Sequence, residues 1–256
     1  HTGIRRQRQM CIRDRSVTFR GDGVPTRAVW NLSLDIAAGE TVALVGESGS
    51  GKSVSALASL GLLPDNAEQG GSVVWKGAEI DRGDAAAMRR LRGNEIGMIF
   101  QEPMTSLNPL HTIEKQIGES LRQHQGMSVE AARARTLDLL NRVGIPGAET
   151  RLASYPHELS GGQRQRVMIA MALANNPDML IADEPTTALD VTIEAQILDL
   201  LADLKRAEGL SMLFITHDLG VVRQIADRVF VMRQGELVES GDAASLFAAP
   251  GEAYTR

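Results

Sequence analysis

The chain has 256 residues, of which 43% are hydrophobic and 23% are charged, and its formal net charge at pH 7 is -5. This balance is that of a folded globular chain and excludes a disordered one. The longest nearly apolar stretch, 54–63, falls well short of the roughly 20 residues that a membrane-spanning helix needs. The acidic net charge argues against sequence-independent binding of nucleic acid, which needs clustered Lys and Arg. Cys11 is the only cysteine, which excludes an internal disulfide.

The first twenty residues carry a basic cluster. A single acid, Asp14, accompanies six arginines, which are Arg5, Arg6, Arg8, Arg13, Arg15 and Arg20. The pair Arg5-Arg6 is not an export signal, because no apolar segment follows it. We expect residues 1–12 to be a disordered or non-native leader; a functional basic arm is the alternative.

Short apolar runs bounded by turn or charged residues predict buried strands. These runs are residues 42–45, 96–100, 179–182 and 212–215. A helix is predicted over 191–208, because Ile197 and Leu201 lie on one apolar face and Gly209 provides a C-terminal stop. Strands that alternate with helices imply a mainly parallel sheet that is covered on both faces.

Two other parts of the sequence depart from this alternation. Residues 16–37 and 71–80 are typical of short antiparallel strands, whereas most of 101–158 is helical, with Ser128 as an N-cap. We therefore expect an α/β fold with a small antiparallel β subdomain and an inserted helical subdomain. The expected domains are a core with the β subdomain over 13–100 and 159–245, and the helical insert over 101–158.

A glycine-rich segment lies between the predicted strand 42–45 and a helical pattern. Its sequence is Gly46-Glu47-Ser48-Gly49-Ser50-Gly51-Lys52-Ser53, which matches G-x-x-x-x-G-K-[ST] in the context that this motif requires. Glycines let successive N–H groups converge on phosphate oxygens, and the following helix adds its positive dipole. The segment therefore predicts a P-loop, in which Lys52 reaches the β- and γ-phosphates and Ser53 coordinates Mg²⁺.

Polar side chains follow three of the predicted strands. Asp183 and Glu184 follow 179–182, and neighbouring residues on a strand point to opposite sides, so the two carboxylates can have different roles. We assign Asp183 to the Mg²⁺ shell and Glu184 to polarising the attacking water. His217 is suited to the γ-phosphate or the water, and Gln101 to Mg²⁺ or water contact. Taken alone, a histidine at a strand end such as His217 is more often structural, and a loop amide is an equally strong interpretation of Gln101.

A second helix start follows in the segment Leu159-Ser160-Gly161-Gly162-Gln163. Ser160 and Gln163 have the spacing of a capping box, and the helix is predicted to run to Asn175 and stop at Asn176-Pro177. Its exposed N–H groups and two glycines predict a second anion site. One nucleotide hardly needs two such sites from one chain, so this site is expected to serve a nucleotide held mainly by a partner.

With these motifs in this order, residues 16–242 resemble the ABC ATPase family. The resemblance implies that two nucleotide-binding domains pair head to tail, with ATP between the P-loop of one and the signature of the other. It assigns the following roles: residues 46–53 Walker A, Gln101 the Q-loop, residues 159–163 the signature, Asp183-Glu184 the end of Walker B, Asp190 the D-loop, His217 the switch, and Phe19 stacking on adenine.

The segments 101–109 and 250–256 are similar to the oligopeptide, dipeptide and nickel importer branch of this family. That branch implies an ATPase that energises uptake of peptides or a related small solute from the cytoplasmic face of the inner membrane. Its partners would be a second ATPase domain, identical or different, membrane permease subunits and, indirectly, an extracytoplasmic binding protein. Members normally continue beyond the Tyr-Thr-Arg element, so we expect a fragment of a longer protein. An ABC exporter domain and a soluble non-transport ABC ATPase are the alternatives.

Overall fold

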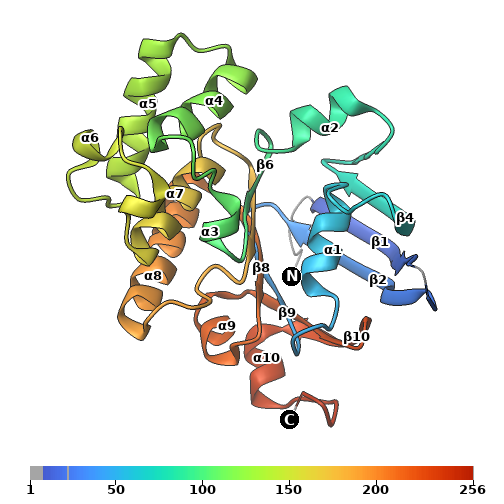
Figure 1. The fold of residues 1–256 in the computed structure, drawn as a ribbon. Helices are drawn as coiled ribbons and strands as arrows, with labels where there is room; N and C mark the ends of the chain where they lie inside the picture. Colours follow the sequence, from blue (N-terminus) through green and yellow to red (C-terminus); the bar gives the residue numbers. More distant parts are fainter. Residues whose placement is uncertain (1–7, 22, 256) are drawn as a thin grey trace. The chain divides into compact units, whose positions relative to one another are not determined.

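The computed structural model describes residues 8–21 and 23–255, which form two compact units. One unit comprises 1–88 and 209–256, and the other comprises 89–208 (Figure 1). The second unit contains all of 101–158, together with strands and helices that the sequence analysis assigned to the core. Among the described residues, no helix combines the length and the hydropathy that crossing a membrane requires.

The first unit contains an antiparallel sheet in the order β2-β1-β4-β5. Its strands are β1 (Arg8–Phe19), β2 (Thr26–Ala37), β4 (Ala67–Trp75) and β5 (Ala78–Glu79). Both predicted antiparallel regions lie within it. The sequence predicts a disordered or non-native leader over 1–12, but residues 8–12 belong to strand β1. Residues 1–7 lie outside the described residues. Met10 and Ile12 are buried and pair with Trp75 and Val73, so apolar burial fixes this part of β1.

Parallel strands form the other layer of the first unit, in the order β10-β9-β3-β8. They are β3 (Thr41–Val45), β8 (Ser211–Thr216), β9 (Arg228–Arg233) and the antiparallel edge strand β10 (Glu236–Asp242). Every residue of β3 and β8 is buried, as expected for parallel strands that are covered on both faces. The helices of this unit are α1 (Lys52–Ser59), α9 (Leu219–Ile225) and α10 (Ala243–Ala248).

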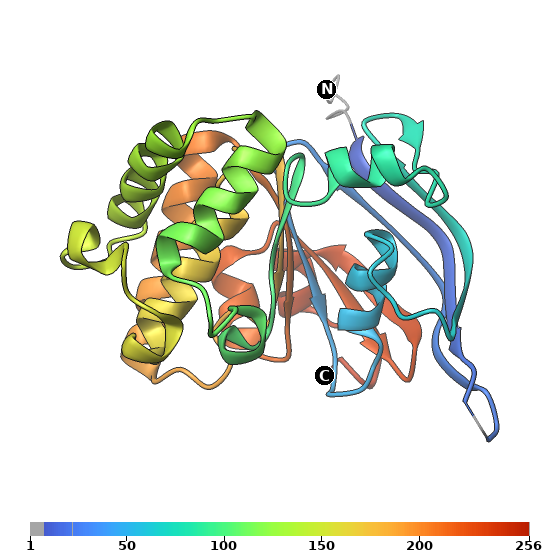
Figure 2. The same cartoon turned by 45° about the horizontal axis from the view of Figure 1, so that its top comes forward.

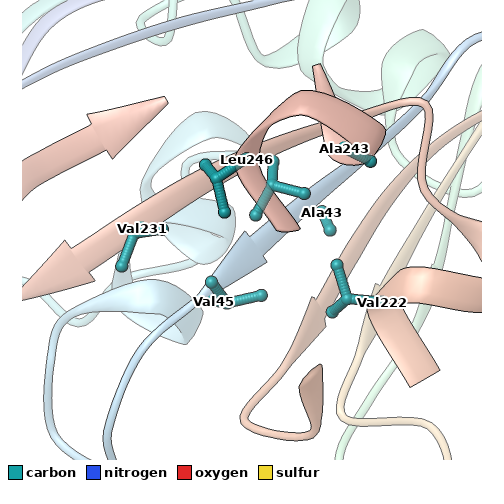
Figure 3. Packing of buried hydrophobic residues seen from close by; sticks show 7 residues of the cluster. Ala43, Val45, Val222, Val231, Ala243 and Leu246 are labelled. Carbon is teal, nitrogen blue, oxygen red and sulfur yellow. The ribbon is translucent and has the colours of Figure 1, made fainter. Parts of the chain in front are cut away.

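An apolar cluster of the first unit lies directly behind the start of the P-loop. Val45, the last residue of β3, packs with Val231 of β9, Val222 of α9 and Leu246 of α10 (Figure 3). The ring of Tyr254 packs partly buried against this cluster. These contacts fix the carboxyl end of β3, from which the P-loop departs.

A buried arginine joins the antiparallel sheet to α1, which lies against β1 and β2 (Figure 1). The Arg15 side chain of β1 is fully buried, and its guanidinium donates to Ala58 O at 2.7 Å and to Gly70 O at 3.2 Å. Burial and the nearby Arg82 lower the pKa of Arg15 to about 10. The guanidinium therefore holds the C-terminal end of α1 against the sheet.

The second unit combines two parallel strands with a group of helices. The strands are β6 (Ile96–Ile99) and β7 (Met179–Asp183). The helices are α3 (Pro103–Ser106), α4 (Ile113–Gln125), α5 (Val129–Arg142), α6 (Ala148–Arg151), α7 (Gly161–Ala172) and α8 (Val191–Glu208), while α2 (Ala85–Leu91) crosses between the two units. Figure 2 shows α4, α5 and α7 packed side by side.

Two of these helices, α5 and α7, start with the capping residue that the sequence predicts. Ser128 accepts a hydrogen bond from Ala131 N at the start of α5, and α8 ends at Glu208, immediately before Gly209. The predicted end of α7 at Asn175 is wrong, because the helix ends at Ala172. Asn176, which precedes a proline, has a positive φ of 52°, so the chain leaves the helical conformation before Pro177.

Candidate functional site

The P-loop connects β3 to α1 through backbone that only glycine accommodates. A Cβ added to Gly46 would lie 2.2 Å from Met232 O, and one added to Gly51, at φ +99°, would lie 2.4 Å from Ala28 O. No real Cβ tolerates either distance, so both positions require glycine. The loop is thereby held between the end of β9 and the start of β2.

Lys52 is the first residue of α1 and is almost completely buried, at 4% exposure. Its Nζ donates to Gly46 O at 2.8 Å and to Glu47 O at 2.9 Å, so the ammonium lies beside the P-loop backbone. Ser53 follows it in the first turn of α1, where N–H groups and the helix dipole favour an anion. The predicted phosphate motif thus lies where its pattern requires, on the loop after β3 and the first turn of α1.

A turn that the sequence analysis missed supports the P-loop from the β9 side. Gly235 N donates to Ser50 O at 3.0 Å, and Gly235 O accepts from Trp30 N at 2.7 Å. Gly235 has φ +85°, and a Cβ there would lie 2.9 Å from Ala28 O. The pair Gln234-Gly235 indicates a turn, but it does not indicate that this turn is hydrogen-bonded to the P-loop.

In the second unit, two carboxylates end β7. Asp183 is the last residue of the strand, and Glu184 has φ +44°; both are buried, at 4% and 9% exposure. Gln101, which follows β6, donates through Nε2 to Glu184 Oε2 at 3.2 Å. The structure therefore brings together two of the residues that the sequence analysis selected separately. Thr187 Oγ1 donates to the same oxygen at 2.8 Å, and the sequence analysis did not select this residue.

The predicted capping box is present at the start of α7. Ser160 Oγ accepts from Gln163 N at 3.3 Å, and Gln163 Oε1 accepts from Ser160 N at 3.0 Å. The two glycines differ in their surroundings. A Cβ on Gly161 would lie 4.0 Å from Leu189 Cδ2, whereas one on Gly162 would lie 2.8 Å from Ile193 Cγ2. The first glycine leaves the helix start open, and the second allows α8 to pack closely.

The remaining candidates lie at the ends of other elements. His217 follows β8 and is exposed, and Phe19 is the last residue of β1. Asp190 is exposed and accepts a hydrogen bond from Ile193 N at 2.9 Å, so it caps the start of α8. The P-loop, His217 and Phe19 belong to the first unit, whereas Gln101, Ser160, Asp183, Glu184 and Asp190 belong to the second.

Comparison with known proteins agrees with this set of motifs. A family model described as ABC transporter matches residues 29–187. The chain is 60% identical over 249 residues to a peptidoglycan transport ATP-binding protein of Agrobacterium fabrum, covering 96% of this chain and 46% of the relative. It is 52% identical to a putative peptide import ATP-binding protein of Brucella ovis, covering 98% of this chain and 76% of the relative. A glutathione import ATP-binding protein of Escherichia coli is 51% identical, covering 96% of this chain and 41% of the relative.

Solved structures give the same result. A dimeric ATP-binding cassette in a post-hydrolysis state, bound to ADP and Pi, superposes with a TM-score of 0.81 at 31% identity, covering 91% of this chain and 98% of that one. A component of an ABC transporter complex of Clostridium perfringens has a TM-score of 0.78 at 27% identity, covering 94% and 91% of the two chains. The chain spans about half the length of two of the curated relatives that it matches. On the matched domain and these relatives, the chain belongs to the ABC transporter family.

Proposed function

We propose that this chain is the ATP-binding and ATP-hydrolysing domain of an ABC importer that takes up peptides or a related small solute. The observation that carries the proposal is the hydrogen bond from Gln101 to Glu184, directly beyond the buried strand that ends in Asp183. An amide and two carboxylates at the carboxyl ends of two paired strands are groups that can hold Mg²⁺ and orient a water molecule for nucleotide hydrolysis. The names of the relatives, which are peptide, peptidoglycan and glutathione transport proteins, support the importer branch.

The P-loop fits the phosphates of ATP. Gly49 has φ +78°, and no atom of the described residues lies within 4 Å of its added Cβ, so this side of the loop is open, while Gly46 and Gly51 are enclosed by backbone. Lys52 would exchange its bonds to loop carbonyls for bonds to the β- and γ-phosphates. The proposed backbone cradle consists of Gly46, Ser48, Gly49, Ser50, Gly51, Lys52 and Ser53.

The donor set also fits Mg²⁺, which prefers oxygen ligands. We assign the Ser53 hydroxyl, the Asp183 carboxylate and the Gln101 amide oxygen to this ion. When bound, Mg²⁺ would neutralise charge on the phosphate oxygens. Asp183 suits this role because its buried position gives the carboxylate a fixed direction.

Glu184 is proposed to orient and polarise the attacking water. Its carboxylate is held by two donors and is nearly buried, so it has a defined orientation for one water molecule. His217 is proposed to hydrogen-bond the γ-phosphate, since it directly follows a buried strand of the first unit. Phe19, at the end of β1, is proposed to stack on adenine.

The signature is proposed to bind the nucleotide held by a second ATPase domain, identical or different, in a head-to-tail pair. The open start of α7 supports this, with Gly161 accessible and the cap completed by Ser160 and Gln163. Asp190 would approach the same interface. A related cassette was solved as a dimer with ADP and Pi bound, which supports a paired arrangement.

The remaining partners follow from the importer proposal. We infer that the chain acts peripherally at the cytoplasmic face of the inner membrane, with permease subunits near Gln101 and the helical insert, 101–158. An extracytoplasmic binding protein would deliver the solute to these subunits, and nucleic acid is not a partner.

Substitution of the general base tests the hydrolytic role. Glu184→Gln keeps the size of the side chain and removes its negative charge, so ATP binding should persist while turnover falls by about a hundredfold or more. Fluorescent-nucleotide titration and phosphate release measure the two effects. Glu149→Gln, on an exposed glutamate of α6, is the matched control and should retain full turnover. Normal turnover of Glu184→Gln would remove Glu184 from this role.

Reconstitution tests the direction of transport. The protein, assembled with its permease subunits in vesicles and supplied with the binding protein, should move a labelled peptide toward the ATPase side when ATP is present. Glu184→Gln in the same vesicles is the control. Movement away from the ATPase side would support the exporter alternative, and copurification with ribosomes or DNA would support a non-transport ATPase.

A further inference from the structure

Thr187 contacts the proposed general base through both its side chain and its backbone. Its hydroxyl donates to Glu184 Oε2 at 2.8 Å, and its backbone N–H donates to Glu184 O at 3.2 Å. The residues 184–187 thus form a turn that folds back on its own first side chain. The hydroxyl bond is shorter than the 3.2 Å bond that Gln101 makes to the same oxygen.

The backbone at Glu184 explains why such a support is needed. Glu184 has φ +44°, which is uncommon for a residue other than glycine, and only 9% of it is exposed. Conformations of this kind persist where surrounding contacts determine them, and they gather at functional sites. Pro185 restricts the next φ, and the backbone bond from Thr187 closes the turn.

We propose that Thr187 is a positioning residue for ATP hydrolysis, whose hydroxyl fixes the orientation of the Glu184 carboxylate. The inference rests on the proposed function, because it gives Glu184 the role of orienting water. Threonine suits the task because its β-branched side chain is stiff at χ1, so the hydroxyl has a defined position. Two donors on one oxygen restrict the position of that oxygen.

The test separates the hydroxyl from the turn. Thr187→Val keeps the branched shape and the backbone bond to Glu184 but removes the hydroxyl, whereas Thr187→Ser keeps the hydroxyl. We expect Thr187→Val to lower kcat by about ten- to a hundredfold, the effect typical of lost orienting contacts, with KM and Kd for ATP within about twofold. Thr187→Ser should restore kcat to within about threefold, because it returns the same donor.

The matched control is Thr150→Val. Thr150 is exposed on α6, and its hydroxyl also makes a 2.8 Å bond, but to Gly147 O. This variant should keep the kcat of the unmodified protein. In a Glu184→Gln background, Thr187→Val should change the residual turnover by less than about twofold. Thr187 is proposed to act through the Glu184 carboxylate, so the effects of the two substitutions should not add.

The outcomes distinguish this inference from the function on which it rests. An inactive Glu184→Gln with a fully active Thr187→Val would overturn the role of Thr187 alone. An active Glu184→Gln would overturn the role of Glu184 in hydrolysis and, with it, the role of Thr187. Equal losses of kcat and ATP affinity in Thr187→Val, without rescue by serine, would show a general structural effect and contradict positioning. If thermal melting shows that Thr187→Val is unfolded, Thr187→Ala removes the same hydroxyl and replaces it in each comparison.

Discussion

The amide nitrogen of Gly235 lies 3.0 Å from the carbonyl oxygen of Ser50, so the β9–β10 turn is bonded to the middle of the P-loop. The carbonyl of the same glycine accepts a hydrogen bond from Trp30 N in β2. One residue between β9 and β10 therefore links the P-loop to the antiparallel sheet. The order of these segments along the chain gives no indication of this link.

Gly235→Ala should weaken ATP binding by about tenfold, because the new Cβ would lie 2.9 Å from Ala28 O and displace the turn from Ser50. Nucleotide titration measures the change. Gly77→Ala is the matched control, since Gly77 has the same φ of +85° but its added Cβ would meet no atom within 4 Å in the part of the chain that the structure describes. Equal losses of affinity in the two variants would show that backbone strain alone is responsible, and unchanged affinity in Gly235→Ala would contradict support of the loop by Gly235.

Lys52→Ala should reduce the affinity for ATP by at least tenfold, since a charge-assisted hydrogen bond contributes about 1.5–3 kcal/mol. The folded state should persist, which circular dichroism would check. Lys115→Ala, on the exposed surface of α4, removes the same charge away from the P-loop and should leave affinity unchanged. Unchanged affinity in Lys52→Ala itself would argue against the P-loop assignment.

Ser160→Ala should have two effects, because it removes the N-cap of α7 at the proposed signature. Loss of the cap should lower the free energy of unfolding by about 1 kcal/mol. It should also impair ATP-dependent pairing of two domains, measured by light scattering with ATP. Ser128→Ala removes an equivalent cap from α5 and should show only the loss of stability. A similar pairing defect in both variants would mean that stability alone controls pairing.

Acidification should destabilise the second unit through His124. Burial and, to a lesser extent, the charge of Arg89 hold the pKa of His124 below its ordinary value of 6.5. The folded state therefore favours the neutral ring. This stabilisation is present above the unfolded-state pKa and is lost as the pH falls through the folded-state pKa. Between pH 7.5 and 5, the melting temperature should fall less for His124→Gln than for the unmodified protein. An identical fall in both would contradict a contribution of His124 to the pH dependence.

Local patterns in the sequence determine much of the fold. The strands predicted at 42–45, 96–100, 179–182 and 212–215 are found within one residue of their expected ends, because each is a short buried run. The caps at Ser128 and Ser160 were also predicted, because a cap depends on residues three positions away. The α/β fold with an antiparallel sheet is therefore confirmed from local information.

Contacts between distant segments could not be predicted in this way. The bond between Gly235 and Ser50 joins residues 185 positions apart, and nothing in either local sequence specifies it. Gln101 and Glu184 were both selected as strand-end residues, but their hydrogen bond depends on the pairing of β6 with β7. Thr187 lies three residues beyond Glu184, and nothing in the local sequence indicates the hydrogen bond between them. The roles of all the candidate site residues, Phe19, His217 and Asp190 among them, stay predictions.

The capping box of α7 has a consequence for how two domains would associate. The Ser160 hydroxyl and the Gln163 side chain are each bonded to the backbone of the same helical turn, so neither depends on a partner for its orientation. The helix start is rigid before any encounter, and little conformational entropy remains to be lost when a second surface meets it. Association should then be limited by diffusion and by domain orientation rather than by local folding of the signature.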